Sequence, residues 1–133
     1  MNDTVEILRR FRRVAVVGIS DKPDRPSHEV ATYLRGAGYE ILPVNPTLSV
    51  WEDLPCYPDL HAVPPPVEVV DIFRRSELVG PIVDEAIAVG AKAIWMQIGV
   101  VDEAASARAR AAGLLVVMDL CMLREHAKIS DQG

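Results

Sequence analysis

The chain contains five short apolar segments separated by stretches with helical periodicity, and this alternation constrains its fold more than any other feature. The segments are residues 13–19, 40–44, 67–73, 93–97 and 114–118. Their apolar residues run almost continuously, which is typical of parallel strands covered by helices on both faces. The alternation predicts an α/β fold with a Rossmann-like, doubly wound parallel sheet of about five strands. A chain of 133 residues suits one core and one domain.

The intervals between these segments have apolar residues at helical spacing. We predict helices over residues 3–11, from Ser27 to Gly36 or Gly38, over 77–89, and over 102–112 with Asp102 as the N-cap. Residues 1–12 then form an N-terminal helix ahead of a core at 13–128. Within that core, residues 119–128 trail away from the last strand.

Residues 47–66 have no clear periodicity and are rich in proline. We predict a surface excursion there, with a turn of helix near residues 59–61.

Composition and charge exclude several functions. The net charge is −5 and the pI is near 5.1, with no lysine or arginine run, so we expect no nucleic-acid partner. No apolar stretch approaches the ~20 residues that span a bilayer, and the first residues lack a signal-peptide pattern. We therefore expect a cytoplasmic protein with no membrane partner. Cys56 and Cys121 have no metal-ligand spacing, which predicts two reduced thiols and no metal site.

The stretch from Arg13 to Ser27 carries the functional hypothesis. An apolar strand stops at Gly18, passes through a polar loop and enters a helix. The start of a helix offers unpaired backbone N–H groups and a favourable dipole, so this turn is suited to an anion. In such a sheet ligands bind beyond the carboxyl ends of the strands. The loops at that edge are residues 18–25, 45–46, 71–74, 97–99 and 119–122.

The first loop departs from the dinucleotide fingerprint GxGxxG. Its three glycine positions hold Gly18, Ser20 and Pro23. A nicotinamide site generally has an acidic residue at the end of the second strand, where this chain has Asn45. Both departures disfavour NAD.

Five segments together resemble a known family. They are GISDKPDRPSHEV, PVNP, VDIFRRSE, WMQIGV and DLCMLREH. In this order they resemble the small CoA-binding proteins whose fold matches the nucleotide-binding domain of the succinyl-CoA synthetase alpha subunit. The resemblance extends from Val14 to His126.

The resemblance implies coenzyme A, or an acyl-CoA, as the ligand. It implies that the first loop holds the pyrophosphate, that the end of the second strand lines the nucleotide, that the end of the third strand forms another wall, and that the end of the fourth borders the pantetheine. The residues that carry over are Gly18, Ile19, Ser20, Asp21, Lys22, Pro23, Arg25, Val44, Asn45, Pro46, Ile72, Phe73, Arg74, Gln97, Ile98 and Gly99.

Structural roles compete with several of these assignments. Gly18 could serve only the turn, Lys22 and Arg25 could form an exposed loop neutralised by Asp21 and Asp24, and Phe73 could belong to the core. Cys121 is open to two interpretations: a buried small residue, or a thiol that faces the cleft near the CoA sulfur.

No catalytic group emerges from the sequence, because no Ser, His and Asp set and no carboxylate pair can be assembled. We therefore expect a CoA-binding domain without catalysis of its own. An NAD(P)-binding oxidoreductase subunit and a regulatory module that senses acyl-CoA remain the alternatives, and a protein partner or a homo-oligomer is left open.

Overall fold

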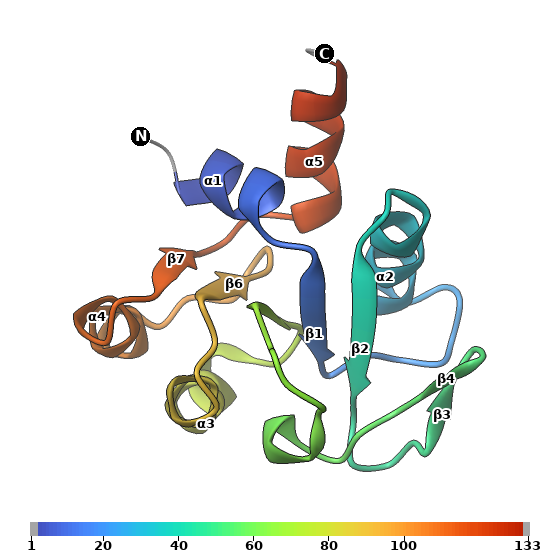
Figure 1. Cartoon of the computed structure of the whole chain (residues 1–133), viewed down its shortest axis with the longest axis horizontal. Coiled ribbons are helices and arrows are strands. Elements are labelled where there is room, and N and C mark those ends of the chain that lie inside the picture. Colours follow the sequence, from blue (N-terminus) through green and yellow to red (C-terminus); the bar gives the residue numbers. More distant parts are fainter. Residues whose placement is uncertain (1–2, 132–133) are drawn as a thin grey trace.

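The computed structural model describes residues 3–131 of the chain and contains a central sheet between two layers of helices (Figure 1). Its elements are α1 (Asp3–Arg10), β1 (Arg13–Val17), α2 (Pro26–Gly36), β2 (Glu40–Val44), β3 (Val50–Trp51), β4 (Leu54–Pro55), the 3₁₀ turn η1 (Leu60–Ala62), β5 (Val69–Ile72), the 3₁₀ turn η2 (Ser76–Leu78), α3 (Val79–Ala88), β6 (Ala93–Met96), α4 (Glu103–Ala111), β7 (Leu115–Val117) and α5 (Met122–Asp131).

The main sheet confirms the predicted fold. It has five parallel strands in the order β2-β1-β5-β6-β7. The chain first adds β2 on one side of β1 and later adds β5 on the other, so the strand order reverses between β1 and β5. In open α/β sheets a ligand binds beyond the carboxyl ends of the strands at such a reversal.

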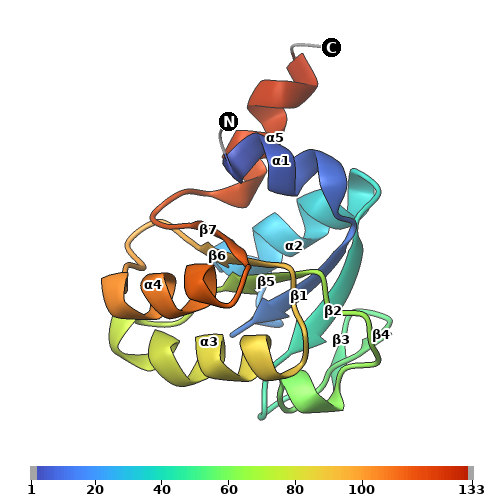
Figure 2. The same ribbon diagram turned by 60° about the vertical axis from the view of Figure 1, so that its left-hand side comes forward.

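Helices cover both faces of the sheet (Figure 2). Alternate residues of the strands build two separate cores, one on each face. Val70 and Ile72 pack toward α3 and α4. Val16 and Trp95 pack toward α1, α2 and α5. Because both faces are covered, the strands need apolar residues at nearly every position, which explains the continuous runs in the sequence.

The predicted helices are present with small shifts at their ends. Asp102 is the N-cap of α4, as predicted, and its Oδ1 accepts a hydrogen bond from the amide of Ala105 at 2.9 Å. Within residues 3–131 no helix has both the length and the apolar character needed to cross a membrane.

Two local predictions were wrong. Residues 119–128 do not trail away, because Met122 starts the helix α5 and its side chain is fully buried against α1 and α2. Residues 47–66 are not simply a surface excursion either. They contain the antiparallel hairpin of β3 and β4, and Trp51 and Leu60 are each only 1% exposed. The hairpin strands have only two residues each and are stabilised by tertiary burial, which local periodicity does not reveal. The helix α5 is amphipathic, and the sequence interpretation overlooked its pattern.

Candidate functional site

A cavity of about 910 Å³ lies at the predicted edge of the sheet, beyond the carboxyl ends of β1, β2, β5 and β6. It is bounded by the loop after β1, the start of α2 and the start of α5. The predicted site residues that line it are Gly18, Ile19, Ser20, Asp21, Lys22, Arg25, Asn45, Phe73, Gln97 and Ile98.

The other predicted site residues lie elsewhere. Val44 and Ile72 are buried in the core between the sheet and α3 and α4, with 3% and 0% of their surface exposed. Their side chains face the opposite side of the sheet from α2, since residues alternate along a strand. The remaining residues outside the cavity lining are Pro23, Pro46, Arg74 and Gly99.

Gly18 is required by the close approach of two loops. Its φ is +86°, and a Cβ at this position would lie 2.5 Å from the carbonyl oxygen of Phe73 and 2.7 Å from Cδ of Arg74. The amide of Phe73 also donates to the carbonyl of Val17 at 2.9 Å. Glycine therefore serves the turn and, at the same time, brings the ends of β1 and β5 together at the reversal of strand order.

The loop after β1 is folded back on the start of α2. The amide of Ser20 donates to Oγ of Ser27 at 2.9 Å, and the amide of Lys22 donates to Oγ of Ser20 at 3.1 Å. In the described part of the chain, the amides of Ile19, Asp21 and Ser27 have no hydrogen-bond partner. Ser27 lies in the first turn of the 11-residue helix α2, where an unpaired amide is suited to an anion.

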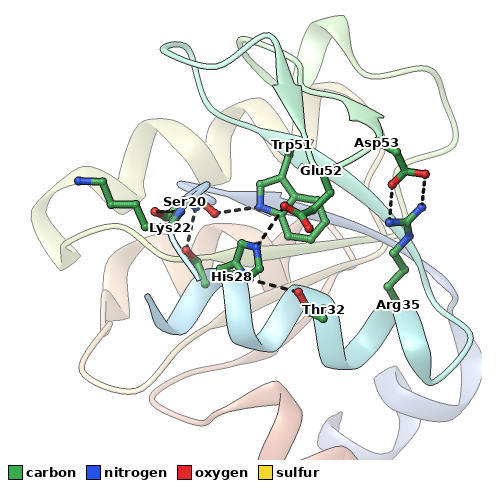
Figure 3. A network of polar contacts seen from close by, with 9 residues as sticks. Ser20, Lys22, His28, Thr32, Arg35, Trp51, Glu52 and Asp53 are labelled. Atoms are coloured by element: carbon green, nitrogen blue, oxygen red, sulfur yellow. Dashed lines mark hydrogen bonds and ion pairs between the residues drawn. The ribbon is translucent and has the colours of Figure 1, made fainter. Parts of the chain in front are cut away.

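Two side chains hold this loop from the neighbouring strands. Nδ2 of Asn45 donates to the carbonyl of Ile19 at 2.8 Å, while its Oδ1 accepts from both the amide and the hydroxyl of Thr47. The indole Nε1 of Trp51 donates to the carbonyl of Ser20 at 2.8 Å (Figure 3). The sequence interpretation missed Trp51, because it placed this residue in a surface segment.

The hairpin that carries Trp51 is itself attached to α2 (Figure 3). Arg35 forms a two-point ion pair with Asp53 at 2.7 and 3.1 Å, and its hydrogen bonds lower the pKa of the Asp53 carboxyl. The ring of His28 lies 5.1 Å from that of Trp51, and its Nε2 lies 3.5 Å from a carboxylate oxygen of Glu52. The hairpin, the helix and the loop therefore form one connected unit.

Three cations line the cavity: Lys22 and Arg25 from the loop, and Arg124 from α5. Between residues 3 and 131, none of these side chains has an ion-pair partner, whereas Arg13, Arg35, Arg108 and Arg110 are all paired. Two carboxylates, Asp21 and Glu29, also line the cavity. A local excess of positive charge in a chain of net charge −5 favours an anionic ligand.

The wall formed by α5 was absent from the predicted site. It contributes Cys121, Leu123 and Arg124. Cys121 is a free thiol that is half-buried and lines the cavity, as one of its two interpretations predicted. The motif DLCMLREH already contained these residues, but without a predicted helix there was no reason to place Arg124 at the cavity.

Gln97 connects the cavity to a carboxyl group inside the protein. Its side chain is 5% exposed, and its Nε2 donates to Oδ1 of Asp71 at 2.6 Å. Asp71 is fully buried, and this burial raises its pKa to about 7 against the opposing effect of the Gln97 hydrogen bond. The other oxygen, Oδ2, is buried and has no hydrogen-bond partner among the residues that the structure describes.

The histidines do not form a common site. His28 contacts the hairpin, His61 lies 3.6 Å from Glu85, and His126 bonds the hydroxyl of Tyr33 at 2.9 Å. Among the described residues, no group of three or more His, Cys, Asp or Glu side chains could hold a metal ion.

The fold and this cavity define a Rossmann-like domain with a cavity at the reversal of strand order whose lining is suited to an anion. The model of the CoA binding domain family matches residues 12–127, and the chain belongs to this family. This confirms the resemblance seen in the sequence.

Comparison with individual proteins and solved structures also finds similar chains. The chain is 42% identical over 122 residues to the uncharacterized protein YneT of Bacillus subtilis (strain 168), which covers 92% of this chain and 90% of that protein. A hypothetical protein from Pyrococcus horikoshii OT3 is 39% identical, with a TM-score of 0.93 over 98% of this chain and 93% of the other. The dinucleotide-forming acetyl-coenzyme A synthetase 1 of Ca. Korarchaeum cryptofilum is 26% identical, with a TM-score of 0.73 over 85% of this chain but only 27% of the synthetase.

Proposed function

We propose that this protein binds coenzyme A, or an acyl-CoA, in the cavity between the loop after β1 and the start of α5. The observation that carries this proposal is the set of unpaired cations and unpaired amides that line one cavity in a member of the CoA binding domain family. Coenzyme A has a diphosphate and a 3′-phosphate, so it can use several cations at once.

The cavity supplies different chemistry along its length. The amides of the first loop, the hydroxyl of Ser20 and the ammonium of Lys22 suit the phosphates. Asn45 and Phe73 suit the nucleotide, with one polar and one aromatic contact. Gln97 and Ile98 suit the pantetheine arm, which has both amide and apolar parts. The volume lies within the range of about 300–1,000 Å³ typical of ligand sites.

We further propose that the chain is a binding domain without catalysis of its own. The acetyl-coenzyme A synthetase resembles it over about a quarter of that enzyme's length, so most of that enzyme has no counterpart in the matched region. The cavity of this chain brings together groups suited to binding, and within the described residues no nucleophile paired with a base lines it.

Calorimetric titration of the purified protein tests the ligand. Coenzyme A is expected to bind with micromolar or tighter affinity, and more tightly than NAD. No acidic residue follows β2 to accept from the ribose hydroxyls, and Oδ1 of Asn45 already accepts two hydrogen bonds from Thr47, which leaves only an N–H of this side chain for a ligand. Equal or tighter binding of NAD would contradict the proposal and favour the oxidoreductase alternative.

Charge removal tests the location of the site. Replacing Lys22 or Arg124 with alanine should weaken coenzyme A binding about tenfold or more, since each loses a charge-assisted contact worth about 1.5–3 kcal/mol. Arg75→Ala is the matched control, because Arg75 is an exposed arginine outside the cavity lining. An equal loss in all three variants would indicate only a general charge effect.

A further inference from the structure

Asp71 is a buried carboxyl group for which the core gives no structural reason. It lies on β5 between Val16 of β1 and Trp95 of β6, and it is 0% exposed. Among residues 3–131, its carboxyl group has one hydrogen bond, from Gln97, and its buried Oδ2 has no partner. A buried polar group that is only partly satisfied destabilises a fold, so an apolar side chain would serve the core better.

Gln97 has one end inside the protein and the other toward the cavity. Its amide nitrogen faces Asp71 at 2.6 Å, and the side chain lines the cavity. The oxygen and nitrogen of a planar amide point in different directions, so Oε1 is directed away from Asp71. In the part of the chain that the structure describes, this oxygen has no hydrogen-bond partner. It is therefore available to a ligand.

The charge of Asp71 controls the orientation of this amide. An ionised carboxylate only accepts hydrogen bonds, so it requires the NH₂ group of Gln97 to face it. A protonated carboxyl group can donate its O–H, and the amide can then turn so that Oε1 faces Asp71 and NH₂ faces the cavity. Protonation of Asp71 thus replaces a hydrogen-bond acceptor on the cavity wall, Oε1 of Gln97, with a donor, its NH₂ group.

We propose that Asp71 is a positioning residue that sets which end of the Gln97 amide faces the cavity, and that its ionised form selects an N–H group of the ligand. This inference rests on the proposed binding of coenzyme A, which has such groups in two places: the amides of the pantetheine arm and the amino group of adenine. Asp71 itself does not line the cavity, so it acts through Gln97.

The ionisation of Asp71 falls in the neutral range, because burial raises its pKa to about 7. Its neighbours on β1 and β6, Val16 and Trp95, carry no charge. No charged side chain is among the causes of the shift. The charged and titratable groups that line the same cavity are Asp21, Lys22 and Arg25 of the loop, Glu29 of α2, and Cys121 and Arg124 at α5.

Nuclear magnetic resonance of the ligand-free protein tests the positioning directly. The chain has only four side-chain amides, those of Asn2, Asn45, Gln97 and Gln132, and Gln97→Met identifies the Gln97 signal by its loss. In a titration from pH 5.5 to 8.5, the Gln97 amide is expected to shift with a midpoint near pH 7. The Asn45 amide is the internal control and should not follow this midpoint, although it lines the same cavity.

The variant Asp71→Asn should abolish the Gln97 titration. A Gln97 signal that does not move in the wild type, or that moves in the same way in Asp71→Asn, would overturn the inference. Because no ligand is present, this outcome is independent of whether coenzyme A binds.

Binding of two fragments then identifies the selected group. Pantetheine carries the amides, and adenosine 3′,5′-bisphosphate carries the adenine amino group. The gain in affinity from pH 6 to pH 8 is measured relative to the same gain in Asp71→Asn, which accounts for the ionisation of the fragment's own phosphates. For the fragment that Gln97 contacts, this relative gain should be about fivefold, as one hydrogen bond of about 1 kcal/mol implies. Asp71→Asn and Gln97→Met should each lose this pH dependence.

The outcomes separate the two proposals. A pH dependence of fragment binding that persists unchanged in both variants, or that is absent from the wild type, would overturn the role of Asp71. Failure of coenzyme A and both fragments to bind at either pH would overturn the proposed function together with the ligand assignment made here. The ligand-free titration would still test whether the charge of Asp71 sets the orientation of the Gln97 amide.

Discussion

Two loops at the cavity, those after β1 and β6, contain a glycine in nearly the same left-handed conformation but are held in different ways. The φ of Gly18 is +86° and that of Gly99 is +84°. A Cβ at Gly18 would clash with the backbone of Phe73, whereas a Cβ at Gly99 would meet nothing within 4 Å. The first turn is therefore fixed by packing between two strands. The second turn has free space around the Cβ position of its glycine.

The hydrogen bonds of the two loops differ as well. The first loop is held by neutral groups, mainly the indole of Trp51 and the amide of Asn45. The second is held by carboxyl groups: Asp119 accepts from the amide of Gly99 at 2.7 Å, and Asp71 accepts from the side chain of Gln97 at 2.6 Å. Under the proposed function, this difference predicts a rigid cradle for the phosphates at the loop after β1 and an adjustable, pH-sensitive wall at the loop after β6.

The largest effect is expected from Gly18→Ala. The left-handed backbone costs a residue with Cβ about 1–2 kcal/mol, and the clash adds about 1–3 kcal/mol of overpacking, so unfolding by urea should show a loss of about 2–5 kcal/mol. Gly99→Ala is the control, and it should lose only about 1–2 kcal/mol. Equal losses in the two variants would mean that the close approach of Phe73 does not constrain the first loop.

Next in size is Trp51→Phe, which removes the indole N–H from the carbonyl of Ser20. We expect about 2 kcal/mol of lost stability from the vacated volume and the unsatisfied carbonyl, together with weaker coenzyme A binding, measured by calorimetry. Trp95→Phe is the control, because it removes the same type of hydrogen bond from the carbonyl of Leu120. It should lower the free energy of unfolding by a similar amount. Its loss of coenzyme A affinity should be smaller, since Leu120 does not line the cavity. An undiminished affinity in Trp51→Phe would show that the hairpin does not support the loop.

Much of this rigid cradle could be predicted from the sequence. Continuous apolar runs predicted the parallel strands, since burial on both faces leaves a signal at every position. The position of Gly18 after the first run then placed the loop at the carboxyl edge of the sheet. Even the extent of β2, residues 40–44, agrees with the structure. These features depend on local patterns and on general rules of sheet topology.

Contacts between distant segments could not be predicted in the same way. Trp51 reaches the carbonyl of Ser20 across 31 positions, and Gln97 reaches Asp71 across 26. Neither distance follows from periodicity, because it depends on how strands lie side by side after folding. Arg124 was missed for a different reason: α5 is amphipathic, but the sequence interpretation took residues 119–128 to trail away from the last strand and assigned them no helix.

A pH series should distinguish the wall held by carboxyl groups from the neutral cradle. The Asp71 carboxyl keeps its proton up to about pH 7 in the folded protein but loses it near pH 3.8 when unfolded. Between these two pKa values the unfolded state therefore binds fewer protons than the folded state. As the pH rises through this range, Asp71 lowers the free energy of unfolding by up to ~1.4 kcal/mol per pH unit. Above the pKa of the folded state it has no further effect. The measurement is urea unfolding of wild type and Asp71→Asn from pH 5 to 8. Their difference isolates this group, and parallel curves would contradict its raised pKa.

The smallest effect on stability is expected at the exposed side of the second loop. Ile98 lines the cavity, yet 56% of its surface is exposed, so Ile98→Ser should change the free energy of unfolding by no more than about 0.5 kcal/mol. The same change should weaken coenzyme A binding about threefold, because covering part of this side chain contributes about 25 cal/mol per Å² of apolar surface. Adenosine 3′,5′-bisphosphate, which has no pantetheine arm, is the control ligand and should bind both proteins equally. If its affinity falls as much as that of coenzyme A, then Ile98 contacts the nucleotide, and the proposed division between a phosphate side and a pantetheine side of the cavity is wrong.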